Sequence, residues 1–261
     1  MKISPKIYAR PFPWKRTAAV FLVFCLGACQ SFERGSRIPV IPPGAVIFVF
    51  DDGPNSHGDT TARLLDVLKK YEVRAMFALL GENAEQNPIL VRRIRAEGHS
   101  IINHGYGDPF VVWMGDEAFY ANLIRGEAAI TAALEEEPEP RLYRPQGGFY
   151  TKGQERIWRE AGYTLIAETI RIYDAVLSAK DKDRAIATLT RMVEKQGGGI
   201  ILLHDGRDSH VRMETELAKS PHGRFNRSWI PDMVEELIIL LREKGYTTPG
   251  FDILNRPDHS G

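Results

Sequence analysis

The sequence predicts an α/β protein with a single domain, an irregular (β/α) barrel whose strands are mostly parallel. Short apolar runs alternate along the chain with longer segments of helical periodicity. This order is typical of parallel strands connected by helices. Two of the runs, 45–50 and 200–203, are apolar at every position, as expected for strands that are covered on both faces.

Six segments have the length and composition of buried strands, and the run at 246–248 is a candidate for a last strand that closes the sheet. Each of the six is rich in aliphatic or aromatic residues and is followed by polar or turn-forming residues. The expected strands are 45–50, 73–80, 100–103, 142–143, 163–168 and 200–203.

Six longer segments carry apolar residues at helical spacing. In the first of them, Leu64, Leu65 and Leu68 share one face, and Asp59 is placed to cap the N-terminus. Glycine follows most of these segments and favours a helix end there. The polar stretch 207–226 has no period and is expected to be a loop, which either borders a site or is a solvated linker. The expected helices are 60–71, 88–97, 116–134, 152–161, 182–195 and 231–244.

The composition is that of a globular protein. The 261 residues include 34 Lys and Arg and 34 Asp and Glu, and 43% of the residues are hydrophobic. These values exclude a disordered, collagen-like or coiled-coil chain, and the mean hydropathy of -0.26 excludes a polytopic membrane protein. Because basic residues are not in excess, no nucleic-acid partner is expected. Trp158 and Trp229 lie in helical patterns and are expected in the core, and packing is also the default for Trp113.

The N-terminal segment has the features of a secretory signal. Basic residues and no acidic residue occur in 1–16, and the apolar run 17–26 is too short to cross a bilayer. Leu26-Gly27-Ala28-Cys29 then resembles a bacterial lipobox, in which the Cys is acylated and becomes the new N-terminus. Cys29 is therefore the expected lipidation site. The alternative is a short anchor, or a cleaved signal with an incidental Cys.

The chain is expected to divide into a lipoprotein signal peptide (1–28), a tether (29–44) and a catalytic domain (45–261). Prolines and a glycine before the first strand favour an extended tether. The predicted location is the cell envelope, with a lipid anchor in a membrane outside the cytoplasm. Because Gln30 rather than Asp follows the Cys, the outer membrane is favoured if the cell is Gram-negative.

Polar clusters follow four of the expected strands, at the strand ends where parallel α/β folds build their sites. Singly each is a weak signal, because Asp-Gly-Pro is usually a turn and a lone His after a strand is often structural. Together they hold carboxylates, two imidazoles and a guanidinium, a set typical of a metal hydrolase. The clusters are 51–54, 104–109, 144–148 and 204–206.

The same clusters resemble the motifs of the polysaccharide deacetylase family, the metal-dependent N-deacetylases of chitin, peptidoglycan and exopolysaccharides. Phe50-Asp51-Asp52-Gly53-Pro54 is similar to the first motif, His104 to Pro109 to the second, Arg144-Pro145 to the third and Leu202-Leu203-His204-Asp205 to the fifth. The resemblance extends in order over about residues 45–250. It implies a hydrolase of non-peptide C–N bonds that removes N-acetyl groups from an acetylated polysaccharide or oligosaccharide.

The resemblance also implies a divalent metal, with Zn²⁺ expected first and Co²⁺, Mn²⁺ or Ni²⁺ as alternatives. Asp52 and His104 correspond to two of its ligands. The third family ligand is usually a His four residues after the first, and that position here is Asp108. A carboxylate can still bind zinc, and its added negative charge favours harder metals. The alternative role for Asp108 is to cap the turn next to Pro109.

Three further residues correspond to the catalytic groups of the family. Asp51 is the general base, which takes a proton from the attacking water. Arg144 pairs with that base and keeps it ionised, although a structural salt bridge is the alternative. His204 is the general acid that protonates the leaving amine. Asp205 is a candidate partner for the His204 imidazole, or a cap of the following turn.

A backbone N–H near Gly147 is expected to help stabilise the negative oxygen that forms on the acetyl group. Leu202 is expected either to form a wall of the acetyl pocket or to pack in the core. The family pattern has Pro and an aromatic residue where this chain has Gln146 and Gly147, and Phe149 and Tyr150 are candidate replacements for the aromatic wall. The Asp-Trp pair of the fourth motif is not evident. That Asp supports the general acid in the family. Asp174 is the candidate for it here, and the Trp is absent.

Two alternative functions remain open from the sequence. One is a glycan-binding pseudoenzyme on the same fold, because the second His of the metal motif and the Trp are missing. The other is a related hydrolase of a smaller acylated substrate. Exposed aromatic residues along a groove would favour a polysaccharide substrate, and a closed pocket would favour the small substrate.

Overall fold

The structure is a computed structural model that describes residues 33–34, 41–107, 110–206 and 226–251. The chain divides into two compact units, 1–31 and 32–261, and all described residues belong to the second. The predicted signal peptide, Cys29 and Asp108 lie outside the described residues. Within the described part of the chain, no helix combines the length and the apolar character needed to cross a membrane.

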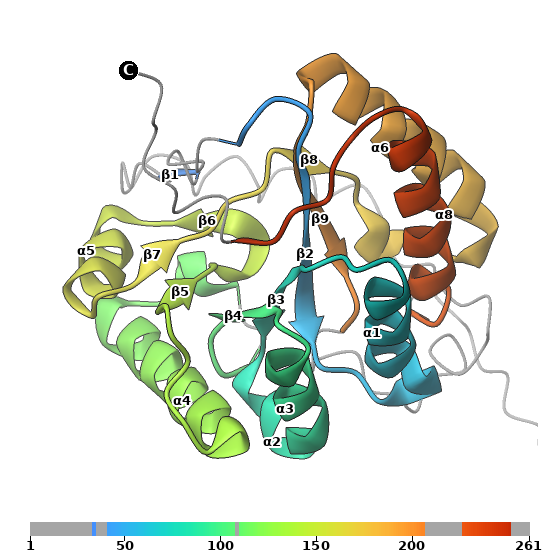
Figure 1. Cartoon of the computed structure of the whole chain (residues 1–261). Helices are drawn as coiled ribbons and strands as arrows, with labels where there is room; N and C mark the ends of the chain where they lie inside the picture. The colour runs from blue at the N-terminus through green and yellow to red at the C-terminus, as the bar shows by residue number, and fades with distance from the viewer. Residues whose placement is uncertain (1–32, 35–40, 108–109, 207–225, 252–261) are drawn as a thin grey trace, which may run out of the picture. The chain divides into compact units, whose positions relative to one another are not determined.

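A seven-stranded sheet lies at the centre of the second unit (Figure 1), with the strand order β7-β5-β4-β3-β2-β9-β8. Every neighbouring pair is parallel, and the strands form a curled half-barrel, which confirms the predicted fold class. The strands are β2 (Val46–Gly53), β3 (Met76–Leu79), β4 (Ser100–Asn103), β5 (Leu142–Tyr143), β7 (Thr164–Leu165), β8 (Ile170–Arg171) and β9 (Gly199–His204).

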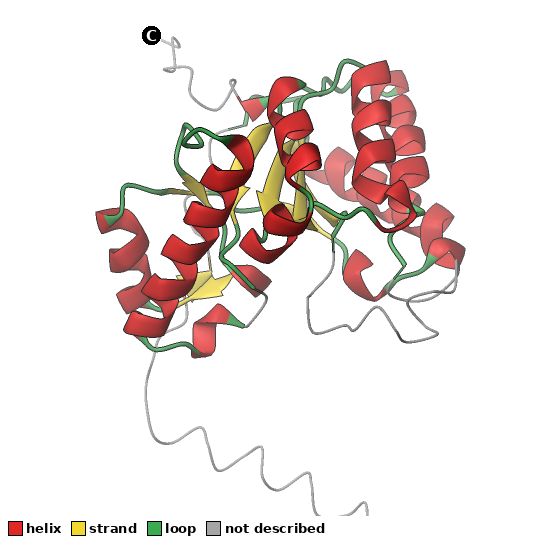
Figure 2. Ribbon diagram, turned by 90° about the horizontal axis from the view of Figure 1, so that it is seen from below, coloured by secondary structure: helices red, strands yellow, loops and turns green. Residues whose placement is uncertain are grey.

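Helices cover one face of the sheet, and the main core lies between the two layers (Figure 2). Side chains alternate along β2, so Phe48 and Phe50 join this core while Ile47 and Val49 join a second apolar cluster on the other face. This arrangement explains why the strand is apolar throughout. The helices are α1 (Thr60–Lys70), α2 (Gly81–Gln86), α3 (Pro88–Ala96), α4 (Asp116–Leu134), α5 (Lys152–Glu160), α6 (Lys182–Gln196) and α8 (Ile230–Glu243).

Short elements connect the helices and strands around the carboxyl ends of the strands. A small strand β6 (Phe149–Tyr150) pairs antiparallel with β1 (Glu33–Arg34). Three 3₁₀ turns bear on the site: η3 (Val111–Trp113), η4 (Gln146–Gly148) and η5 (Asp174–Val176). Two more, η2 (His57–Asp59) and η6 (Ala179–Asp181), precede α1 and α6.

The expected helices and strands are present, and the differences fall in short elements. The sequence analysis did not predict α2 or β8, which are too short to show a period. The expected strand at 246–248 is reduced to a single parallel bridge between Ala45 and Thr247. Asp59 stands at the N-cap of α1, but its side chain makes no capping hydrogen bond.

The three tryptophans of the domain differ in burial. Trp158 and Trp229 are buried as expected. Trp113 on η3 is 75% exposed, so the packing role expected for it is wrong.

The carboxyl ends of β2, β4, β5 and β9 lie at one edge of the sheet, because all four strands run parallel. The described residues of the four polar clusters therefore lie at that edge.

Candidate active site

The first motif occupies the end of β2, where the chain turns sharply. Asp52 has φ of 68°, a left-handed conformation that is uncommon for a residue with a side chain. The register with β3 shifts between Asp51 and Gly53 at the same point. In a regular strand two adjacent carboxylates would point to opposite faces. Here Asp51 Oδ2 and Asp52 Oδ1 lie 3.7 and 3.3 Å from the same atom, His104 Nε2.

His104 follows β4 and is buried, with its ring fixed at both nitrogens. Nδ1 lies 2.8 Å from the carbonyl oxygen of Arg144 and donates to it, so Nε2 faces the two carboxylates. Burial alone would lower the pKa of His104, but the charges of Asp51 and Asp52 raise it above its ordinary value. Burial would likewise raise the pKa of Asp52, but the hydrogen bond to His104 and the charge of His204 lower it to about 2.

The Asp52–His104 pair fits two ligands of a divalent metal. An imidazole that donates from one nitrogen to a backbone carbonyl and presents the other to a carboxylate has the usual orientation of a metal-ligating His. The low pKa keeps Asp52 ionised, as a ligand must be. Within the described residues, no three or more His, Cys, Asp or Glu side chains are grouped so that they could together hold a metal ion. The predicted third ligand, Asp108, lies outside that part.

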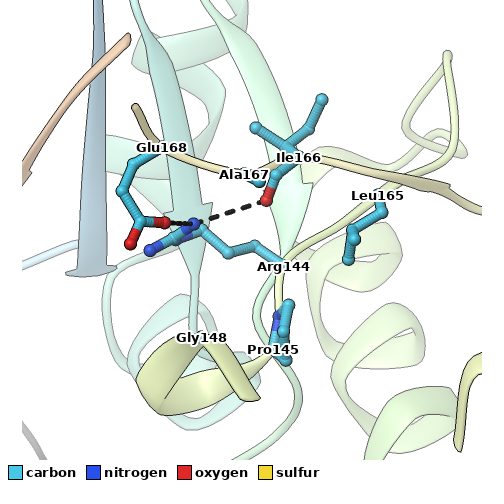
Figure 3. Close-up of a pocket in the computed structure, with 7 residues that line it drawn as sticks. All are labelled: Arg144, Pro145, Gly148, Leu165, Ile166, Ala167 and Glu168. Carbon is cyan, nitrogen blue, oxygen red and sulfur yellow. Dashed lines mark hydrogen bonds and ion pairs between the residues drawn. The ribbon is translucent and has the colours of Figure 1, made fainter. Parts of the chain in front are cut away.

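Arg144 pairs with Asp51, as the sequence analysis expected. Its Nε donates to both carboxylate oxygens of Asp51, at 2.9 and 2.7 Å, and both side chains are buried. Its Nη1 donates to Glu168 Oε2 at 2.8 Å and to the Ile166 carbonyl at 3.3 Å (Figure 3). Burial would lower the pKa of Arg144, but the two carboxylates raise it above its ordinary value, so the guanidinium stays charged.

His204 at the end of β9 forms an ion pair with Asp174 of η5. Its Nδ1 and its backbone N–H each lie 2.8 Å from one of the two carboxylate oxygens of Asp174, which is fully buried. Burial would lower the pKa of His204, but the Asp174 charge and hydrogen bond raise it to about 9. Arg227 donates to the carbonyl oxygens of Asp174 and Ala175, at 3.2 and 2.8 Å, and thereby holds η5 in place.

Asp205 does not orient His204. It accepts a hydrogen bond from the Thr61 hydroxyl on α1, and burial raises its pKa to about 7. Its backbone carbonyl accepts from Asn55 Nδ2 at 3.0 Å, and the next residue, Gly206, donates its N–H to the Asp51 carbonyl at 3.2 Å. A Cβ at Gly206 would collide with the Asp52 carbonyl, so glycine lets the ends of β2 and β9 touch.

The expected acetyl pocket is only partly as predicted. Gly147 has φ of 75°, and a ring carbon of Phe110 lies 3.4 Å from where its Cβ would be. Phe110, which is 70% exposed, thus stands beside the expected oxyanion donor. Tyr150 is buried and packs edge-on against Trp158, so it cannot form the aromatic wall that the sequence analysis considered.

Leu202 and Phe149, two more residues of the predicted pocket, differ in their exposure to solvent. Leu202 is buried in the second apolar cluster, which supports its alternative role in core packing. Phe149 on β6 is 41% exposed. Gln146 is buried and donates from Nε2 to the Gly107 carbonyl at 2.6 Å, which ties η4 to the loop that follows His104.

Comparisons with known proteins agree with this geometry. The polysaccharide deacetylase family model matches residues 41–166. A peptidoglycan-N-acetylglucosamine deacetylase of Bacillus cereus is 28% identical over 177 residues, which cover 67% of this chain and 78% of the relative. A chitooligosaccharide deacetylase of Rhizobium leguminosarum bv. trifolii is 39% identical over 102 residues, but these cover 38% of this chain and 46%, less than half, of the relative.

A solved structure extends the likeness to the fold. It is a peptidoglycan N-acetylglucosamine deacetylase in complex with 4-naphthalen-1-yl-N-oxidanyl-benzamide, with 27% identity and a TM-score of 0.64 over 83% of this chain and 90% of that one. The chain is therefore similar to polysaccharide deacetylases, in sequence over residues 41–166 and in fold over most of its length. Its structure brings Asp51, Asp52, His104, Arg144 and His204 to one edge of the sheet.

The sequence analysis missed three residues of the candidate site. Arg227 follows a segment without periodicity, so it had no positional signal. Glu168 had one, because it is the last residue of the expected strand 163–168, but the observed strand β7 ends at Leu165. Phe110 had one usable signal, since it lies six residues after His104 in the expected loop. The fourth-motif candidate Asp174 lies where the resemblance suggested, against the His204 ring.

Proposed function

We propose that the protein is a metal-dependent hydrolase that removes N-acetyl groups from amino-sugar polymers. The observation that carries the proposal is the convergence of Asp51 and Asp52 on His104 Nε2, at 3.7 and 3.3 Å. Asp51 is hydrogen-bonded to the buried Arg144. Asp52 lies beside the His104 imidazole and is the carboxylate that would bind the cation. This places a candidate base next to candidate metal ligands.

Asp52 and His104 would hold the metal, with Asp108 as the proposed third ligand, and Zn²⁺ is the first candidate over Co²⁺, Mn²⁺ or Ni²⁺. When bound, a divalent metal supplies a Lewis acid for the acetamide carbonyl and lowers the pKa of water. The donor set of two carboxylates and one imidazole suits borderline to hard cations.

The remaining steps are assigned to the protein's own side chains. Asp51 takes the proton from the water whose oxygen forms the new bond to the acetyl carbon, and Arg144 orients Asp51 through two hydrogen bonds. His204, with its pKa raised to about 9 by Asp174, is protonated at neutral pH and gives its proton to the nitrogen as the C–N bond breaks. The Gly147 N–H helps to stabilise the negative oxygen. The products are acetate and a free amine.

A glycan substrate is supported by exposed aromatic residues around the site. Phe110 stands beside Gly147, and Tyr173 precedes Asp174; each is 70% exposed. Aromatic faces of this kind can pack against sugar rings, whereas a small acylated compound would need a closed pocket. The named relatives act on peptidoglycan N-acetylglucosamine and on chitooligosaccharide, and both fit this class.

We further propose a lipid anchor at Cys29 that holds the enzyme in the cell envelope. The support comes from the basic segment, the apolar run and the lipobox-like residues before Cys29. An enzyme outside the cytoplasm would meet cell-wall glycans directly.

The test is acetate release by the purified chain from N-acetylglucosamine oligomers and from peptidoglycan fragments. We expect release that stops when a chelator removes divalent metal and returns when Zn²⁺ or Co²⁺ is added. We also expect inhibition by an N-hydroxybenzamide such as the compound bound to the solved relative. Binding of these glycans without acetate release would contradict the proposal and support a glycan-binding pseudoenzyme.

A further inference from the structure

Glu168 is a buried carboxylate beside the proposed catalytic groups that the mechanism has not yet used. It lies between β7 and β8, and its side chain is 7% exposed. Its two oxygens have different partners: Oε2 accepts from Arg144 Nη1 at 2.8 Å, and Oε1 lies 3.5 Å from Arg171 Nη1. Burying a carboxylate is costly unless it is paired, and these two contacts help to stabilise it there.

Arg144 therefore joins two carboxylates. Its Nε holds Asp51, and its Nη1 holds Glu168. A guanidinium is planar and rigid, so fixing the Nη1 end also fixes the direction of the Nε–H. Without Glu168, the Nη1 end would keep the longer 3.3 Å hydrogen bond to the Ile166 carbonyl.

The packing around the guanidinium is not complete. Figure 3 shows a small cavity beside Arg144 and Glu168, bordered by Pro145, Gly148 and Ile166. Its volume is about 20 Å³, enough for about one water molecule. The side chains around the guanidinium therefore leave room for a water beside it.

We propose that Glu168 is a positioning residue that acts through Arg144 to aim the Asp51 carboxylate at the attacking water. The inference rests on the proposed deacetylase reaction, in which Asp51 is the base. Arg171 supports the same arrangement from the other side, because it contacts Glu168 Oε1 and lies over the Tyr173 ring. Glu168 itself touches no substrate atom in this scheme.

The experiment compares Glu168→Gln and Glu168→Asp with the wild-type full chain in the acetate-release assay. Because a misplaced reacting group slows the chemical step, kcat of Glu168→Gln should fall about 10- to 100-fold while KM changes less than about twofold. Glu168→Asp keeps the charge and should recover part of the loss. The matched control is Glu155→Gln, which removes an Arg partner on the surface of α5 and should leave kcat unchanged.

Each outcome decides between the two claims. A wild-type chain that releases no acetate overturns the proposed function, and this inference with it. An active wild type with an equally active Glu168→Gln overturns the inference alone, as does a loss that appears in KM rather than kcat. If Glu168→Gln does not fold, Glu168→Asp decides: kcat reduced about threefold or more at unchanged KM supports the inference, and kcat equal to wild type overturns it.

Discussion

The protonation of His204 is set by one buried carboxylate. Asp174 contacts both the ring and the backbone N–H of His204, so its charge and its geometry act on the same residue. With the pKa of His204 raised to about 9, the imidazole carries its proton throughout the neutral range. A general acid must be protonated to act, so the proposed reaction should lose its acid as the pH rises through about 9.

Asp174→Asn tests this at the residue scale. Without the negative charge, the pKa of His204 should fall, and the alkaline limb of the kcat profile should move to lower pH by about 1–3 units. The measurement is kcat against pH for both proteins. An unchanged limb would show that His204 is not the group that titrates there.

The contribution of the His204–Asp174 ion pair to folding stability should also depend on pH. Because the pKa of His204 is raised from 6.5 to about 9, the ion pair contributes its full stability below pH 6.5 and loses it as the pH rises through about 9. The stability difference between wild type and Asp174→Asn should therefore shrink at alkaline pH.

At this scale the sequence identified the groups but not all of their partners. Asp51 and Arg144 were paired correctly from the motif resemblance alone. Asp205, adjacent in sequence, was one candidate partner for His204, but the contact is made by the fourth-motif candidate Asp174, thirty residues away. Glu168 could not be predicted, because a contact between side chains that follow different strands depends on sheet order, which no local pattern specifies.

Among the elements, α4 comes unusually close to the loop that carries His104. A Cβ at Gly126 would lie 2.5 Å from the Gly105 carbonyl carbon and 2.8 Å from Asn103 Oδ1. Asn103 uses that oxygen to accept from the Gly105 N–H at 2.8 Å. Glycine at 126 thus lets the helix support the turn after β4, which positions His104.

Gly126→Ala tests this packing. The change favours helix by about 1 kcal/mol, but crowding against backbone costs about 1–3 kcal/mol or more, so we expect a net loss of about 1–2 kcal/mol in unfolding free energy. Acetate release should also fall, because the His104 loop must move. Denaturant unfolding measures the first effect. Gly115→Ala, at the N-cap of the same helix with nothing within 4 Å, is the control.

A Gly126→Ala protein as stable and as active as the control would show that α4 does not constrain the loop. The helix itself was predictable, since the expected bounds of 116–134 match the observed ones. The close approach was not, because an isolated glycine in a helical pattern does not reveal what it packs against.

For the whole molecule, the order of the sheet decides where chemistry can occur. The parallel strands place all four polar clusters at one edge, although the clusters are separated by up to about 150 residues in the chain. Periodicity predicted the alternation of strands and helices and therefore this edge. It could not give the strand order, which depends on contacts between distant segments.

The proposed membrane anchor belongs to the same scale. Cys29→Ser should abolish incorporation of labelled palmitate and shift the protein from the membrane to the soluble fraction, because a thioether requires the thiol. Cys25→Ser, four residues earlier, is the matched control and should keep both the label and the membrane association. Labelling that persists in Cys29→Ser would exclude this lipidation site.

The central claim is that Asp51 is the base beside a metal held by its neighbours. The most direct measurement is the acetate-release rate of Asp51→Asn, with bound metal quantified in the same sample. General base catalysis contributes about 10²- to 10⁴-fold, so the rate should fall by that factor while metal content stays at the wild-type level. Asp66→Asn, which removes an exposed partner of Arg93, should change neither. A rate within a few-fold of wild type for Asp51→Asn would contradict the claim.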